Sequence, residues 1–287
     1  MDVKRFLARF LEIMNGANPL RRLVSRFLWL SRICYLVVFD VEGIKYRFSP
    51  SSMSAEMWVN PRYLKNEVTI SKEVLKSCNH KKITVVDVGA NIGVFSLMMA
   101  KLMPESEIHA FEPHPKIFKF LAKNIELNGA SIFIHNVALG SKSAKVFISN
   151  KHADDMNQII AVPTRSRTET SMTTLDALFR DNDISLLKID VEGMEKEILL
   201  GALNTLERVQ NLIIEVDAEN YRQFGTTIEE VIEILKNLDF ILVGIYQRNR
   251  NLQLTYPLKL SGARGENILA TKMTKEEINN LLSAFNN

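Results

Sequence analysis

The chain has 287 residues, of which 46% are hydrophobic, so it is long enough to bury one large core. Its net charge of +3 is too small to support nucleic acid as a partner. The two cysteines, Cys34 and Cys78, exclude a disulfide framework and lack a metal-binding spacing, so we expect a reducing, cytoplasmic environment.

The positive charge is concentrated in the first part of the chain. Residues 1–82 carry 15 Lys or Arg against 7 Asp or Glu, a net charge of +8, whereas the remaining residues carry −5. The apolar stretch 23–39 is interrupted by Arg26 and Arg32, whereas a membrane-spanning helix needs about 20 mainly apolar residues. We therefore predict a basic amphipathic arm, helical or extended, over residues 1–64 and a folded domain over residues 65–287. Peripheral membrane contact through residues 1–40 stays open, but packing of the arm on the domain or on a second subunit is favoured.

From Lys82 onward, short apolar runs alternate with helical patterns, which predicts a parallel sheet with helices on its faces. The predicted strands span residues 83–88, 107–111, 132–137, 184–189 and 211–216, with a closing pair at 240–246 and 267–271. The predicted helices span residues 93–103, 115–128, 173–180, 195–206 and 227–238. Residues 149–171 are polar without sustained periodicity, which predicts a long excursion from the core.

The first predicted strand ends in an acid and leads into a glycine turn, Asp-Val-Gly-Ala-Asn-Ile-Gly at residues 87–93. Gly89 and Gly93 permit tight backbone geometry and close approach of a ligand. A nucleotide-type ligand then lies over the carboxyl ends of the strands. Glu112 ends the next strand, about 20 residues downstream, where an acid can accept hydrogen bonds from ribose hydroxyls. These features fit NAD and S-adenosylmethionine alike.

The composition of the turn separates these two cofactors. Dinucleotide binding uses the pattern G-x-G-x-x-G, in which a pyrophosphate lies on the helix amino end, whereas the middle position here is Asn91. Asp87 would repel a pyrophosphate in a partly desolvated site but would attract the sulfonium and ammonium groups of S-adenosylmethionine. S-adenosylmethionine is therefore favoured, and a nicotinamide-dependent oxidoreductase is the alternative.

A second acidic motif, Lys-Ile-Asp-Val-Glu-Gly at residues 188–193, places Asp190 and Glu192 at the carboxyl end of a strand, and Glu215 ends the next one. Methyl transfer is an in-line displacement in which an acceptor hydroxyl loses a proton, so a carboxylate here can act as general base. Asp190 is the first candidate, followed by Glu192 and Glu215. Glu192 can equally serve only the amino end of the following helix. Several carboxylates can also hold a divalent ion, but no metal site is predicted.

Five motifs, in this order and spacing, closely resemble the FkbM family of methyltransferases. They are residues 87–93 (Asp-Val-Gly-Ala-Asn-Ile-Gly), 110–113 (Ala-Phe-Glu-Pro), 136–140 (Asn-Val-Ala-Leu-Gly), 174–176 (Thr-Leu-Asp) and 188–195 (Lys-Ile-Asp-Val-Glu-Gly-Met-Glu). The resemblance covers about residues 65–245. It implies a Rossmann-like class I methyltransferase fold, α/β in class, with a doubly wound, mostly parallel sheet of seven strands whose last strand is antiparallel.

The resemblance also implies S-adenosylmethionine as methyl donor and O-methylation of a sugar, glycan, glycolipid or other small metabolite. It implies that Asp87, Gly89, Asn91, Gly93 and Glu112 bind the cofactor. The adenine is then expected near Val137 and Ala138. A non-catalytic module that binds the cofactor and recruits partners through residues 1–60 is a further alternative, and an oligomer is possible.

Overall fold

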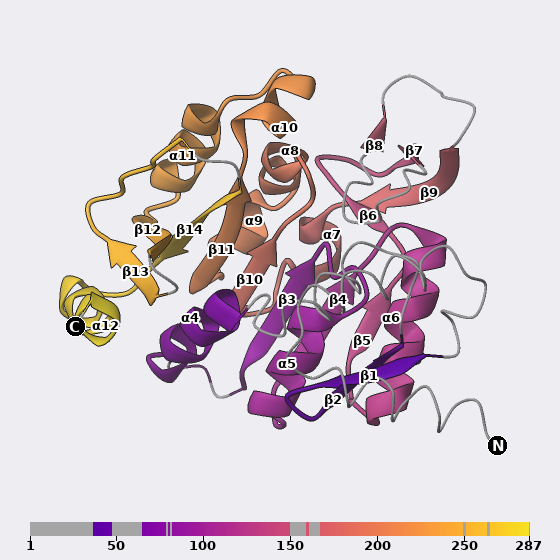
Figure 1. The fold of residues 1–287 in the computed structure, drawn as a ribbon. Helices are drawn as coiled ribbons and strands as arrows, with labels where there is room; N and C mark the ends of the chain where they lie inside the picture. The colour runs from indigo at the N-terminus through magenta and orange to yellow at the C-terminus, as the bar shows by residue number, and fades with distance from the viewer. Residues whose placement is uncertain are drawn as a thin grey trace.

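The computed structural model describes residues 37–47, 65–78, 80, 82–149, 159–160, 167–248, 251–262 and 265–286 (Figure 1). Eight strands form the central sheet in the order β13-β12-β14-β11-β10-β3-β4-β5. Their bounds are β3 Thr84–Val88, β4 Glu107–Phe111, β5 Phe133–His135, β10 Leu186–Ile189, β11 Asn211–Val216, β12 Ile241–Arg248, β13 Asn251–Thr255 and β14 Glu266–Thr271.

The strands from β11 to β5 pair in parallel, as expected where helices connect successive strands. β14, the last strand of the chain, lies antiparallel between β11 and β12. The predicted mostly parallel sheet with an antiparallel last strand is thus confirmed. The predicted count of seven is one too few, because β13 extends the sheet as an antiparallel hairpin partner of β12.

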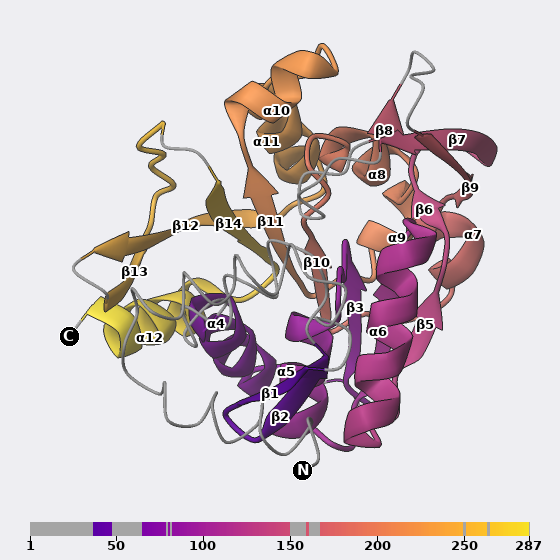
Figure 2. The same cartoon turned by 45° about the vertical axis from the view of Figure 1, so that its right-hand side comes forward.

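Helices cover both faces of the sheet, so the fold is doubly wound (Figure 2). One face packs against α4, α5, α6 and α12, and the other against α7 to α11. Their bounds are α4 Lys65–Lys76, α5 Val94–Leu102, α6 Pro115–Asn128, α7 Leu175–Phe179, α8 Glu195–Leu200, α9 Leu203–Leu206, α10 Ala218–Gln223, α11 Ile228–Asn237 and α12 Lys275–Asn286. None of these helices is long and apolar enough to cross a membrane.

The helix predicted over residues 195–206 is divided into α8 and α9. Gly201 lies at the break, where a Cβ would come within 2.0 Å of the carbonyl oxygen of Gly140. The close approach of these two backbone segments therefore requires glycine and interrupts the helix.

The prediction of a long excursion at residues 149–171 is corrected, because parts of this segment belong to a second, four-stranded sheet. Its order is β6-β9-β7-β8, with β6 Ala138–Leu139, β7 Ala144–Ser149, β8 Ile159–Ile160 and β9 Arg167–Thr173. Most side chains of β9 are polar and alternate between exposed and half-buried, so the strand carries no apolar period. The parts of the excursion at 150–158 and 161–166 lie outside the described residues.

A short hairpin, β1 (Val38–Val41) and β2 (Ile44–Arg47), is the described part of the predicted arm. Its apolar side chains join the core on the α5 and α6 side. Two asparagines of α6 complete its hydrogen bonding, because Asn128 and Asn124 accept from the backbone nitrogens of Lys45 and Arg47, both at 2.8 Å. Predictions for residues 1–36 and 48–64 lie outside the described residues, and the domain boundary at residue 64 stays a prediction.

Candidate functional site

The strand register places a row of polar side chains at the carboxyl edge of the sheet. Asp87 of β3 lies opposite Lys188 of β10, and Glu215 of β11 lies opposite Asn267 of β14. Residues two apart on a strand share a face, so Asp190 follows Lys188 on the same face. Nearer the amino ends of these strands, that face carries buried apolar residues under α4, α5 and α12: Val85, Leu186, Ile213 and Leu269. The charged row continues this apolar face toward the edge where ligands bind in such sheets.

Lys188 is the buried cation of this row. Its side chain is 4% exposed, and its Nζ lies 2.7 Å from Oδ2 of Asp190 and 5.6 Å from the ring centroid of Phe95. Burial alone would lower the pKa of Lys188, but three nearby carboxylates, led by Asp190, raise it above its ordinary value. Lys188 was not among the predicted site residues, although it was one of two polar residues in an apolar strand.

Asp190 and Glu215 form a hydrogen-bonded carboxyl pair. Burial acts to raise the pKa of Asp190, but the ion pair with Lys188 holds it below its usual range. The charge of Asp190, together with burial, raises the pKa of Glu215 to about 10. At neutral pH the pair therefore holds one proton between its two carboxyls, because two like charges this close cannot both ionise easily.

Glu192 follows Asp190 in the loop and turns toward α10. Its backbone has a φ of 60°, and its Oε2 accepts a hydrogen bond of 2.6 Å from Nδ2 of Asn220. Its charge nevertheless acts on Glu215. The structure thus brings together the three acids proposed as catalytic, but it engages Glu192 with a helix.

Asp87 is fully buried beneath the glycine turn. Its Oδ2 accepts a hydrogen bond of 2.5 Å from Oγ of Ser96, while no partner for its Oδ1 lies in the described part of the chain. Burial raises the pKa of Asp87, although Lys188 and Ser96 act in the opposite direction. A buried carboxylate oxygen without a donor is costly, so a ligand that donates a hydrogen bond here would stabilise the site.

The glycine turn closes tightly over the end of β10. A Cβ at Gly89, where φ is +88°, would lie 1.9 Å from the carbonyl oxygen of Asp190. Asn91 has a φ of 51° and a buried Oδ1 for which the described residues supply no partner. Gly93, at φ 90°, immediately precedes α5. Backbone geometry therefore holds the glycine turn close against the loop that carries Asp190.

Glu112 joins this turn to the end of β4. Its Oε2 accepts from the backbone nitrogen of Asn91 at 3.0 Å, and its Oε1 accepts from that of His114 at 2.8 Å. Nδ2 of Asn136 donates to the carbonyl of Glu112 at 2.9 Å, which brings in the segment leading to Val137 and Ala138. The predicted cofactor residues from three strand ends thus lie in one connected region.

Residues 87–242 match the family model of the methyltransferase FkbM domain, which is more than half of the chain. The chain belongs to the FkbM methyltransferase family. The match begins at Asp87 and includes the glycine turn, Glu112 and the carboxyl pair.

Three relatives illustrate this FkbM membership. Methyltransferase 1 of Beauveria bassiana is 31% identical over 46% of this chain and 64% of its own length. Hexuronic acid methyltransferase AglP of Haloferax volcanii is 28% identical over 63% of this chain and 74% of its own length. The 31-O-demethyl-FK506 methyltransferase FkbM of Streptomyces tacrolimicus is 26% identical over 56% of this chain and 73% of its own length. The match thus spans slightly less than two thirds of the first relative.

Two acids in the motifs shared with the FkbM family have structural contacts. Asp176 accepts hydrogen bonds from the backbone and side chain of both Asn204 and Thr205, at 2.7 to 3.2 Å, and thereby ties α7 to α9. Glu195 is buried, and its Oε1 accepts from the backbone nitrogen of Val191 at 3.2 Å. It therefore supports the loop that carries Asp190.

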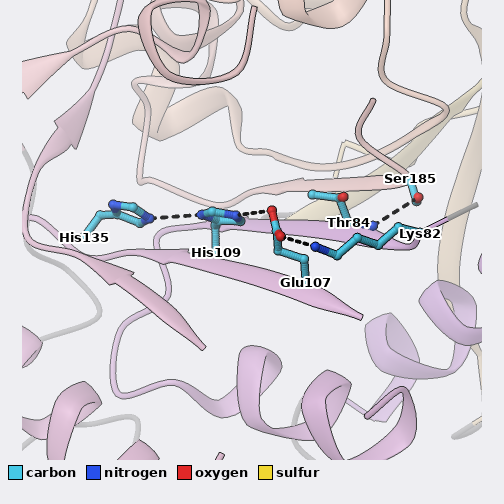
Figure 3. Close-up of polar contacts among 6 residues, drawn as sticks. All are labelled: Lys82, Thr84, Glu107, His109, His135 and Ser185. Carbon is cyan, nitrogen blue, oxygen red and sulfur yellow. Dashed lines mark hydrogen bonds and ion pairs between the residues drawn. The ribbon is translucent and has the colours of Figure 1, made fainter. Parts of the chain in front are cut away.

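A series of polar contacts lies on the opposite face of the sheet (Figure 3). Glu107 binds Lys82 and lies 2.9 Å from Nε2 of His109, whose Nδ1 lies 3.1 Å from Nε2 of His135. The rings of Phe111 and His135 stack with centroids 4.3 Å apart. Within the described ranges, no three His, Cys, Asp or Glu side chains are grouped to hold a metal ion.

We expect these contacts of His135 to make the free energy of unfolding pH-dependent. Burial and the charge of His109 lower the pKa of His135 below its ordinary value of 6.5. The unfolded protein then binds this proton more readily, so the contribution of neutral His135 to the free energy of unfolding is complete above about pH 6.5 and declines as pH falls below it. Urea unfolding at several pH values would measure the decline, and His135→Gln should reduce it. An unchanged slope in the variant would exclude His135 as its source.

Proposed function

We propose that the chain is an S-adenosylmethionine-dependent O-methyltransferase whose acceptor is a hydroxyl of a sugar, glycan or other small metabolite. Two observations carry the proposal: the link between Asn91 and Glu112, and the buried Oδ1 of Asp87, for which the described residues supply no partner. Glu112 would bind the ribose hydroxyls, and Asp87 would favour the positive charge of the cofactor. Gly89 and Gly93 would allow the cofactor to approach the backbone, and Val137 and Ala138 would border the adenine.

The residues present fit this cofactor. Each carboxylate oxygen of Glu112 accepts a backbone hydrogen bond, and a carboxylate oxygen can accept more than one. The row of acids, with Lys188 as its buried cation, favours a ligand with positive charge over a pyrophosphate. When bound, S-adenosylmethionine supplies an electrophilic methyl group.

Asp190 is the proposed general base. As the oxygen–carbon bond forms, the acceptor hydroxyl would pass its proton to the Asp190 carboxylate, which is ionised at neutral pH. Glu215, already protonated, would remain so and hold Asp190 in place by their hydrogen bond. Lys188 would fix the other side of Asp190 and keep it in one orientation.

The acceptor class is proposed from two relatives. AglP of Haloferax volcanii is named for a hexuronic acid, and FkbM of Streptomyces tacrolimicus for 31-O-demethyl-FK506, which is a substrate name that specifies an oxygen. The second name fits a base that removes a hydroxyl proton, and the first specifies a sugar acid as acceptor without specifying the atom that is methylated. Isotope-labelled methyl transfer to sugar acids, other sugars and polyketide alcohols would rank these acceptors.

The first test is isothermal titration of the full chain with S-adenosylmethionine and, separately, with NAD. We expect S-adenosylmethionine to bind and NAD to bind much more weakly. Preferential binding of NAD would instead favour an oxidoreductase. Intact cofactor binding without transfer to any acceptor would favour a non-catalytic module.

Glu112→Gln should weaken S-adenosylmethionine binding by about tenfold to a hundredfold, because hydrogen bonds to charged groups each contribute about 1.5–3 kcal/mol. The amide can accept from only one of the two backbone nitrogens that the carboxylate now binds. Glu126→Gln, on the more exposed part of α6, is a matched control and should bind as the wild type does. Equal dissociation constants for all three proteins would remove Glu112 from the cofactor site.

A further inference from the structure

Glu67 is a further acid next to the charged row at the carboxyl edge of the sheet. It comes from outside the matched family domain. It lies in the first turn of α4, before the segment 87–242. α4 packs beside α5 on the face of the sheet that carries the row (Figure 1). The Oε2 of Glu67 is buried and lacks a hydrogen-bond partner in the described structure, and its Oε1 has only a long contact of 3.5 Å with Nδ2 of Asn267.

The surroundings of Glu67 are charged on more than one side. β3 contributes Asp87, β10 contributes Lys188, the loop after β10 contributes Asp190, and β14 contributes the neutral Asn267. Burial raises the pKa of Glu67 to about 7, and the two aspartates add to this while Lys188 opposes it. Near neutral pH the side chain therefore exists in both protonation states.

The structure gives Glu67 little to do for stability. Lys188, the nearby cation, already has its short ion pair with Asp190. A glutamine would keep the contact with Asn267 and would avoid the cost of burying a charge. What would make a carboxylate favourable here is a positively charged ligand. The Oδ1 of Asp87, on the same face, also has no partner among the described residues and indicates a missing donor as well.

We infer that Glu67 extends the cofactor site onto α4 and provides a negative charge for the cationic part of the methyl donor, its ammonium or its sulfonium group. This inference rests on the proposed function. Because a neighbouring cation favours the ionised carboxyl, the protonated fraction of Glu67 releases its proton to solvent when the donor binds. The helix before the family domain then takes part in ligand binding.

The test compares Glu67→Gln with Glu73→Gln in the full chain. Glu73 lies on the same helix but pairs with Lys76 at 2.6 Å, away from the row. Dissociation constants for S-adenosylmethionine and S-adenosylhomocysteine would be measured by calorimetry from pH 6 to 8.5, in two buffers of different ionisation enthalpy to detect proton release. We expect wild-type binding of S-adenosylmethionine to tighten as pH rises through about 7, with proton release.

Glu67→Gln should bind S-adenosylmethionine about tenfold or more weakly at pH 8 and lose this pH step, whereas Glu73→Gln should match the wild type. Equal weakening for both ligands identifies the ammonium, which both contain; weakening for S-adenosylmethionine alone identifies the sulfonium. Glu67→Asp, which keeps the charge, should restore part of the affinity and serves as the second variant if Glu67→Gln fails to fold. Wild-type affinity and pH profile in Glu67→Gln overturn the inference alone. A wild-type protein that binds neither ligand overturns the proposed function with it.

Discussion

Asp190→Asn is expected to slow methyl transfer by about a hundredfold to ten-thousandfold, the usual contribution of general acid–base catalysis, and to weaken S-adenosylmethionine binding far less. The amide cannot take the proton of the acceptor hydroxyl. The carboxylate is ionised at neutral pH because Lys188 lowers its pKa, so the wild-type base is ready before the acceptor binds. Single-turnover transfer rates and calorimetric dissociation constants would separate the chemical step from binding.

Loss of the carboxylate also leaves Lys188 without its partner at 2.7 Å. Because the side chain of Asp190 is 33% exposed, breaking this ion pair should cost less than the about 3–5 kcal/mol of a fully buried pair, and the free energy of unfolding must be measured beside the rate. Glu192→Gln is the matched comparison, and it should slow transfer less, because that carboxylate is engaged by Asn220. Wild-type turnover in Asp190→Asn would remove Asp190 from the mechanism.

β4 and β11 begin and end at the predicted residues. β11 is buried at all positions except Glu215, so its apolar run is nearly continuous, whereas in β4 the half-buried Glu107 and His109 alternate with buried apolar residues. α6 also matches, since Pro115 at its start and Gly129 at its left-handed end are local signals. β13 was missed although its sequence, Asn-Leu-Gln-Leu-Thr, alternates as an edge strand does.

Other features depend on contacts between distant segments. The break at Gly201 results from the backbone of Gly140, which is 61 positions away in the chain. Glu67 is one acid on an amphipathic helix, and no motif marks it until α4 is packed beside Lys188 and Asp87. The motifs could therefore locate the acids on strand ends, whereas the acid supplied by a covering helix required the tertiary structure.

Gly89→Ala is expected to reduce the free energy of unfolding by more than about 4 kcal/mol and to abolish S-adenosylmethionine binding. The added Cβ would lie 1.9 Å from the carbonyl oxygen of Asp190 and 2.9 Å from its carbonyl carbon. Both are backbone atoms, so no side-chain rotation relieves the overlap. The turn must move away from β10, which separates Asn91 from its position beside Glu112. Urea unfolding and calorimetric titration would measure the two effects.

Gly129→Ala provides the control for backbone conformation. Gly129 also has a positive φ, +59°, but a Cβ there would meet no atom within 4 Å. Its substitution should cost only the left-handed conformational penalty of about 1–2 kcal/mol and leave cofactor affinity unchanged. The difference between the two variants then measures the contact between the turn and β10. If both variants lost equal stability and both bound the cofactor normally, the close approach of Gly89 to Asp190 would not be what shapes the site.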